Sequence, residues 1–170
     1  MRDIPLAPSF EIFEDRSSKG NLVPVYAELT ADYETPLSAF HKISDGFHSF
    51  LLESAESTDR AGRYSFIGSN PRAIIEARGT KVKVSENDKF KEFESKSGDP
   101  LCELEEFMSR YQPVPGPELP VFYGGAVGYL SYDSVRYFET SIPEAPPDEL
   151  DLPDMLFMIA QTVIIFDHRL

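Results

Sequence analysis

The feature that most restricts how this chain folds is an apolar run near its C-terminal end. Residues Met155–His168 are strand-like and strongly apolar. Such composition is typical of strands buried in the middle of a sheet. Because an exposed edge of this kind invites pairing with other chains, the sequence predicts that this run lies inside a sheet. We expect that sheet to be completed by residues beyond those given, as in one portion of a larger protein.

A second apolar run, Phe50–Leu52, is followed at once by Glu53 and Ser54 and then by a polar loop. The returning segment Arg63–Ile67 also has strand character, so the sequence predicts that the two segments pair. Successive side chains on a strand point to opposite faces. The carboxylate of Glu53 and the hydroxyl of Ser54 therefore diverge where the strand ends. Polar groups placed in this way suit the mouth of a pocket.

The carboxylate of Glu53 needs a partner if it lies at the edge of a core, because burying it unpaired is unfavourable. Three arrangements are open from residue types alone. Glu53 forms an ion pair with Arg63 or Arg60, or it is solvated, or it accepts the cationic group of a ligand. The ion pair is the ordinary interpretation of a strand-end glutamate near arginines.

The length and composition are those of a folded globular unit. The 170 residues are 41% hydrophobic and 26% charged, which is too apolar for general disorder, and we expect one compact unit. The formal net charge of −13 opposes binding to nucleic acids and to anionic membranes. The sequence contains no run of about 18 apolar residues and no apolar leader, so it predicts neither a membrane span nor export.

Cys102 is the only cysteine, so no intrachain disulfide can form, and the sequence predicts a cytoplasmic protein. Cys102 falls at an apolar position of a predicted helix, where we expect a buried, small apolar side chain. It has no metal-ligand spacing with His41, His48 or His168, so no metal site is predicted. No complete catalytic motif occurs, and no catalytic residue is assigned.

Alternating and β-rich stretches predict further strands. Ala73–Arg78 and Lys81–Val84 predict a hairpin with a two-residue turn. Leu22–Leu29 predicts an edge strand, because Pro24 cannot donate to a ladder. Residues 85–99 are charged and contain glycine and serine, and we expect a solvated loop or strand tip there.

Two helix starts are marked by a capping residue followed by proline. Thr35–Pro36 begins a helix that is expected to end at Gly46, and Asp99–Pro100 begins a second one. The second helix carries an apolar stripe with a spacing of three and four residues, which predicts core contact rather than cofactor binding. The stripe consists of Leu101, Leu104, Phe107, Met108 and Tyr111.

Three of the five residues Gly124–Gly128 are glycines, and aromatic residues flank them in the stretch Val121–Asp133. This pattern predicts a strand that another backbone approaches closely, or a bulge. It matches neither the dinucleotide-binding fingerprint nor the P-loop, so a phosphate cradle is the weaker interpretation. Beyond it we expect a short helix over Asp133–Glu139 and an acidic, proline-rich surface loop over 140–154.

Several of these motifs together resemble the N-terminal region of anthranilate synthase component I, with matching order and spacing over roughly residues 20 to 168. The motifs are Pro24–Tyr26, Leu51–Ser54, Gly62–Gly68, Gly124–Tyr129, Tyr132, Asp133 and Arg136. The resemblance implies an α+β fold of antiparallel, orthogonal β-sheets with flanking helices, which is the incomplete N-terminal portion of a larger β-sandwich enzyme. Residues 1–20 would be an N-terminal extension and residues 21–170 the N-terminal regulatory domain, without the catalytic C-terminal domain.

In this family the Leu51–Ser54 motif belongs to the allosteric site for L-tryptophan, the feedback inhibitor. The resemblance therefore implies that Glu53 and Ser54 bind tryptophan, and their position near the returning strand makes Tyr64 and Ser65 neighbouring candidates. A carboxylate can accept from the ammonium group of the ligand and a hydroxyl can bond its polar groups, while apolar walls hold the indole.

The other functions implied by the resemblance belong to the intact enzyme. That enzyme is a lyase of tryptophan biosynthesis, which converts chorismate and ammonia to anthranilate and pyruvate. A glutamine amidotransferase subunit, component II, delivers the ammonia. The C-terminal chorismate-binding domain carries the Mg²⁺ ligands and the chemistry, so the present residues alone are expected to lack activity. Two alternatives stay open: the same region of aminodeoxychorismate synthase component I, in the folate pathway, and a stand-alone amino-acid-binding module.

Overall fold

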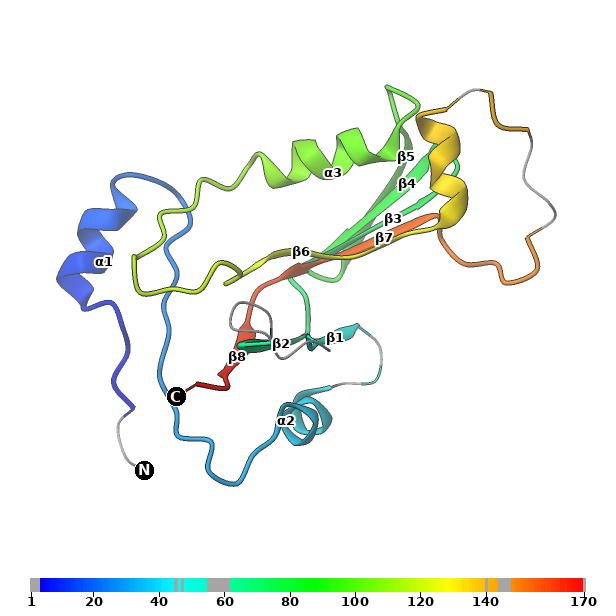
Figure 1. Ribbon diagram of the computed structural model, residues 1–170. Helices are drawn as coiled ribbons and strands as arrows, with labels where there is room; N and C mark the ends of the chain where they lie inside the picture. The colour runs from blue at the N-terminus through cyan, green and yellow to red at the C-terminus, as the bar shows by residue number, and fades with distance from the viewer. Residues whose placement is uncertain are drawn as a thin grey trace.

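The computed structural model describes residues 4–44, 46, 48–54, 62–139, 141–143 and 148–169. Within this part the chain forms two antiparallel sheets, one of three strands and one of five, with helices flanking them (Figure 1). The predicted α+β class with antiparallel sheets and flanking helices is confirmed. None of the helices in the described ranges is both long and apolar enough to cross a bilayer.

The five-stranded sheet has the order β5-β4-β3-β7-β6, and α3 (Pro100–Met108) lies over one of its faces (Figure 1). Its strands are β3 (Ala73–Arg78), β4 (Lys81–Glu86), β5 (Lys89–Glu94), β6 (Gly125–Leu130) and β7 (Met155–Ala160). The hairpin predicted for β3 and β4 is confirmed. The apolar stripe of α3 also faces the core as predicted, since Phe107 is buried there with Ile75, Val82 and Met155.

The three-stranded sheet has the order β1-β2-β8, with β1 (Ser49–Leu52), β2 (Tyr64–Ser69) and β8 (Val163–Asp167). The predicted pairing of the first two strands is confirmed. Helix α2 (Pro36–Ile43) packs against β1 and β2, on the side away from the five-stranded sheet (Figure 1). It begins where expected, because Thr35 and Ser38 cap each other reciprocally. It ends at Ile43, earlier than the predicted Gly46.

The apolar C-terminal run does not form one continuous strand. Gln161 and Thr162 interrupt it, so that β7 lies inside the five-stranded sheet and β8 pairs with β2 in the other sheet. The prediction of a central strand therefore holds for β7. Among the described strands, β8 is at an edge of its sheet. One apolar run thus joins the two sheets.

Two strand predictions are wrong. Leu22–Leu29 makes only isolated bridges, one between Ala7 and Tyr26 and one between Leu22 and Pro113, so it is an extended segment rather than a strand. Conversely, the predicted loop over 85–99 contains β5. Asn87 and Asp88 both have positive φ, as a tight hairpin turn requires, and the lysines and glutamates of β5 disguised its alternation.

Cys102 is exposed, which corrects the prediction that it is buried. Each helical residue is rotated by about 100° from the one before it, so Cys102 turns away from the core that Leu101 contacts. Its thiol instead lies 3.8 Å from the Oδ2 atom of Asp99, the capping residue of α3.

The predicted close backbone approach at the glycine-rich stretch is confirmed at Gly128 in β6. A Cβ atom on Gly128 would clash with the carbonyl oxygen of Leu156 in the neighbouring strand β7. The predicted short helix follows β6 as the 3₁₀ helix η1 (Tyr132–Tyr137). Residues 140 and 144–147 of the predicted surface loop over 140–154 lie outside the described residues, and the described ones form no helix or strand.

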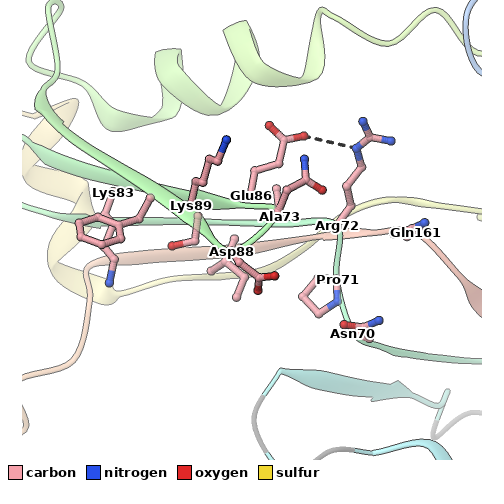
Figure 2. A pocket seen from close by; sticks show the side chains of 13 residues that line it. Asn70, Pro71, Arg72, Ala73, Lys83, Glu86, Asp88, Lys89 and Gln161 are labelled. Atoms are coloured by element: carbon pink, nitrogen blue, oxygen red, sulfur yellow. Dashed lines mark hydrogen bonds and ion pairs between the residues drawn. The ribbon is translucent and has the colours of Figure 1, made fainter.

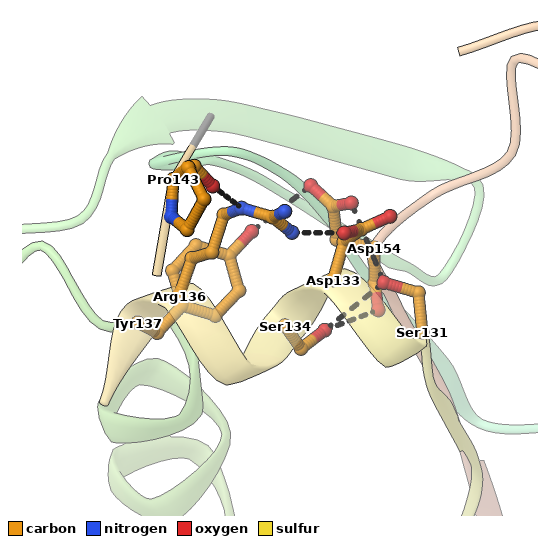
Figure 3. A network of polar contacts seen from close by, with 7 residues as sticks. All are labelled: Ser131, Asp133, Ser134, Arg136, Tyr137, Pro143 and Asp154. Carbon is orange, nitrogen blue, oxygen red and sulfur yellow. Dashed lines mark hydrogen bonds and ion pairs between the residues drawn. The ribbon is translucent and has the colours of Figure 1, made fainter. Parts of the chain in front are cut away.

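Polar contacts anchor η1 to the five-stranded sheet (Figure 3). The hydroxyl of Tyr137 lies 2.9 Å from both the Gly79 carbonyl and the Asp154 carboxylate, and Ser134 donates to the Asp154 carbonyl. Burial raises the pKa of Tyr137 well above its ordinary value, and the adjacent Asp154 carboxylate adds to this shift. Arg136 pairs with Asp133 and donates to the Pro143 carbonyl. These contacts fix the chain where β6 passes into the segment that leads to β7.

Helix α1 (Phe10–Ser17) lies within the predicted N-terminal extension. Arg16 of this helix pairs with Glu118 at 3.2 Å, and Asn21 exchanges hydrogen bonds with Arg110 and Gln112. The first residues are therefore tied to the connection between α3 and β6. The proposed boundary between residues 20 and 21 stays a prediction.

Candidate functional site

The candidate site lies at one end of the three-stranded sheet, where β1 ends, β2 begins and β8 ends. Glu53 and Ser54 directly follow β1, and Ser65 is the second residue of β2. His168 directly follows β8. Antiparallel pairing of β2 with both neighbours brings these three strand ends to the same edge.

Ser65 is the centre of the site. Its side chain is buried, with only 2% of the residue exposed, whereas Glu53 and His168 are exposed. The Oγ atom of Ser65 lies 3.4 Å from Oε1 of Glu53 and 2.8 Å from Nε2 of His168. A buried hydroxyl therefore bridges a carboxylate and an imidazole that come from different strands.

The strand register sorts the four predicted site residues into two pairs. Leu52 lies opposite Phe66, so continued alternation puts Glu53 on the face of Ser65, as their contact shows. The same alternation puts Ser54 on the face of Tyr64. Alternation would thus make the carboxylate and the hydroxyl that follow β1 diverge, and this divergence stays a prediction.

Arg63 does not pair with Glu53. Its guanidinium binds Asp167 at the end of β8, with contacts of 3.0 and 3.2 Å from Nε and 2.6 Å from the terminal nitrogen. These hydrogen bonds from Arg63 hold the pKa of Asp167 below its ordinary value and raise the pKa of Arg63. The other predicted partner, Arg60, lies outside the described residues. Glu53 is thus held by the hydroxyl of Ser65 rather than by Arg63.

Aromatic side chains line the other face of β2. The rings of Tyr64 and Phe66 are 5.9 Å apart, and Phe66 meets Phe122 edge-on at 5.1 Å. The guanidinium of Arg63 lies over the Tyr64 ring, 4.7 Å from its centre. These aromatic side chains lie on the face of β2 opposite to Ser65 and Glu53, the face on which alternation would put Ser54.

The contact between Ser65 and His168 does not make a nucleophilic serine. In such sites the carboxylate orients the imidazole, and the hydroxyl is open to substrate. Here the carboxylate of Glu53 contacts the serine, and the serine is buried. The arrangement suits fixing a carboxylate in place.

The described residues contain no group of three or more histidine, cysteine, aspartate or glutamate side chains that could hold a metal ion. The Mg²⁺ implied by the family resemblance therefore has no fitting ligand set in this part of the chain.

A surface hollow of about 520 Å³ lies at the opposite end of β2 from Ser65, between Asn70, the β4–β5 turn and Gln161 (Figure 2). Two of its cations already have carboxylate partners: Arg72 lies 3.4 Å from Glu86, and Lys83 lies 3.7 Å from Glu76. This mutual neutralisation makes the hollow a weaker candidate than the strand end at Ser65.

The sequence prediction missed His168. It has no metal-ligand spacing, and it is 103 residues from Ser65, so no local spacing connects the two. The one available signal was its place directly after an apolar strand, where a polar side chain comes to the edge of a sheet.

The α+β architecture defined above has a counterpart among solved structures. A crystal structure of anthranilate synthase component I from Streptococcus pneumoniae matches 85% of this chain and 30% of its own, with a TM-score of 0.50 and 29% identity. No protein-family model matches the chain.

Comparison with curated protein sequences shows which proteins this chain is related to. Anthranilate synthase component 1 of Pseudomonas aeruginosa is 40% identical over 153 residues, covering 87% of this chain and 30% of the relative. The Synechocystis sp. protein of the same name is 38% identical over 165 residues, covering 96% of this chain and 32% of the relative. The chain is homologous to the N-terminal portion of anthranilate synthase component 1, and it spans about a third of the length of these relatives.

Proposed function

We propose that this chain is the tryptophan-sensing N-terminal segment of an anthranilate synthase component 1. The intact protein would convert chorismate and ammonia to anthranilate and pyruvate in tryptophan biosynthesis. Its partners would be a C-terminal chorismate-binding domain, which carries Mg²⁺, and the glutamine amidotransferase component II. The homology over most of this chain supports the enzyme assignment, and the relatives named above favour the anthranilate branch over the aminodeoxychorismate branch. We also propose a cytoplasmic location.

The observation that carries the effector site is the carboxylate of Glu53, held by a buried hydroxyl at the end of a strand whose other face carries aromatic side chains. An L-tryptophan ammonium would donate to Glu53, and a polar group of the ligand would bond the hydroxyl of Ser54. Ser65 would hold Glu53, and Tyr64 would contribute to the aromatic wall. Binding at this strand end would favour a state of the intact enzyme that binds chorismate poorly. Such allosteric couplings are typically about 1 to 3 kcal/mol.

The test is inhibition of anthranilate formation by L-tryptophan in the full-length protein. Loss of one charge-assisted hydrogen bond predicts that Glu53→Gln weakens inhibition by about tenfold or more, with uninhibited turnover retained. Ser54→Ala is expected to weaken it in the same direction. The matched control is Glu92→Gln, which removes an exposed glutamate from β5. Unchanged inhibition in Glu53→Gln would remove Glu53 from the site, and formation of aminodeoxychorismate instead of anthranilate would reassign the enzyme.

A further inference from the structure

The single hydroxyl proton of Ser65 restricts the directions of its two hydrogen bonds. A serine hydroxyl has one proton to donate and can accept through its lone pairs. Its Oγ atom contacts two groups at once, Oε1 of Glu53 at 3.4 Å and Nε2 of His168 at 2.8 Å. Because an ionised carboxylate only accepts, both contacts are hydrogen bonds together only if His168 brings a proton on Nε2.

We propose that His168 is a positioning residue for Glu53: it donates from Nε2 to Ser65, and Ser65 in turn donates to the carboxylate. The opposite direction, with Ser65 donating to an unprotonated Nε2, would leave hydroxyl lone pairs facing a carboxylate oxygen. Since Ser65 is only 2% exposed, water cannot readily relieve that contact. The relay therefore runs from imidazole to hydroxyl to carboxylate.

The acidic neighbour of His168 in the chain is paired with an arginine, so it does not compete for the hydrogen bonds of the relay. Asp167, next to His168 in the chain, is bound by Arg63 through both of its carboxylate oxygens. The backbone amide of His168 donates to the carbonyl of Arg63 at 2.9 Å, which fixes the backbone that carries the imidazole ring. The amide of Arg169 donates to Asp167 at 3.1 Å. The pairing of β2 with β8 thus sets the position of the imidazole relative to Ser65.

The relay has a consequence for ligand selection, and this consequence rests on the proposed function. With Oε1 of Glu53 held by Ser65, the carboxylate has one orientation, and it presents Oε2 to the ammonium of the effector. Holding the carboxylate in its binding orientation beforehand improves affinity, because less conformational freedom is lost when the ligand binds. His168 should therefore matter for ligands that carry an ammonium group, and not for the deaminated analogue indole-3-propionate.

The first experiment measures binding of L-tryptophan and indole-3-propionate to the full-length protein by calorimetry. His168→Phe removes the donor, and we expect the dissociation constant for tryptophan to rise about tenfold, as for one hydrogen bond to a charged group. His168→Gln keeps an N–H donor at a similar reach and should restore binding to within about threefold. His41→Gln, which changes an exposed histidine on α2, is the matched control and should bind normally.

Unchanged tryptophan binding in His168→Phe would overturn the proposal. Equal weakening in the Phe and Gln variants, with the same loss for indole-3-propionate, would also overturn it, because it would mean a general structural role. If the unsubstituted protein binds no tryptophan, the proposed function fails, and the direction of the relay is decided by the second experiment.

The second experiment needs no ligand, and its deciding measurement is made on the unsubstituted protein. Proton–nitrogen spectra of the protein with labelled histidines report which ring nitrogen carries the proton when the ring is neutral, at pH about 8.5, well above the ordinary histidine range. We expect His168 to be protonated on Nε2 and its resonances to shift in Ser65→Ala. A neutral ring protonated on Nδ1 would overturn the proposal whatever the binding results.

Discussion

Arg63 and Asp167 form a two-pronged ion pair between the start of β2 and the end of β8, with a shortest contact of 2.6 Å. The pair takes Arg63 away from Glu53, which lies on the other side of β2 from β8. Glu53 thereby keeps its carboxylate for the hydroxyl of Ser65. The Arg63–Asp167 ion pair thus leaves Glu53 to bond Ser65 and not Arg63.

This pair predicts a pH dependence of stability. Because the folded-state pKa of Asp167 is lowered, its contribution is present above the unfolded value, ordinarily about 3.9. That contribution is lost as the pH falls through the folded-state pKa. Thermal unfolding between pH 7 and 3 should therefore show a smaller acid-dependent decrease in Asp167→Asn than in the unsubstituted protein. Asp151→Asn is the control, since Asp151 pairs with Arg78 while its side chain is 93% exposed. An equal change in both variants would contradict the prediction.

Truncating the core side chain of α3 should be costly. Phe107 is 2% exposed and packs among Ile75, Val82 and Met155. Phe107→Ala leaves a cavity, and we expect the free energy of unfolding to fall by about 3 to 5 kcal/mol, measured by urea denaturation. Phe90→Ala is the matched control because Phe90 is 70% exposed on β5, and its effect should be within about 0.5 kcal/mol. Comparable losses in the two variants would show that α3 is not packed as described.

The close approach of β6 to β7 should make Gly128 intolerant of any side chain. A methyl group there would meet the Leu156 backbone, which cannot move aside like a flexible side chain. We expect Gly128→Ala to lower the free energy of unfolding by about 1 to 3 kcal/mol in a denaturant titration. In Gly98→Asn the new side chain enters open space, and asparagine tolerates positive φ, so little change is expected. Full stability of Gly128→Ala would argue against this pairing.

The hydroxyl of Tyr137 ties η1 to the β3–β4 turn and to Asp154. Tyr137→Phe removes that hydroxyl and leaves two acceptors with one donor fewer, so a loss of about 1 to 2 kcal/mol is expected. Tyr132→Phe is the control, because Tyr132 is 93% exposed on the same 3₁₀ helix. Calorimetric melting of both variants makes the comparison, and a null effect in Tyr137→Phe would show that the network contributes no net stability.

The elements that the sequence predicted correctly are those set by residues close together in the chain. The capping pair at Thr35, the Asp99–Pro100 helix start and the hairpin of β3 with β4 each depend on residues close together in the chain. Strand β5 was missed because its alternating charges resemble a solvated loop. Leu22–Leu29 was overpredicted because β propensity does not supply a neighbouring strand.

In the candidate site, too, the features set by residues close together in the chain were predictable, and those set by distant residues were not. Glu53 and its approach to Ser65 were predictable, because the two strands are neighbours in sequence and their pairing was foreseen. The roles of Asp167 and His168 were not, since β8 joins β2 across about a hundred residues that include the whole five-stranded sheet. Such long-range pairing leaves no trace in local spacing. Binding of tryptophan by these residues stays a prediction.

The apolar run that contains β7 and β8 has a further consequence for how the molecule comes apart. Two residues, Gln161 and Thr162, are all that separates a central strand of one sheet from a strand of the other. Detaching β8 from β2 therefore pulls directly on β7, which has neighbours on both sides. Amides in both sheets should then exchange with solvent through a shared opening event, so that the two sheets unfold as one cooperative unit.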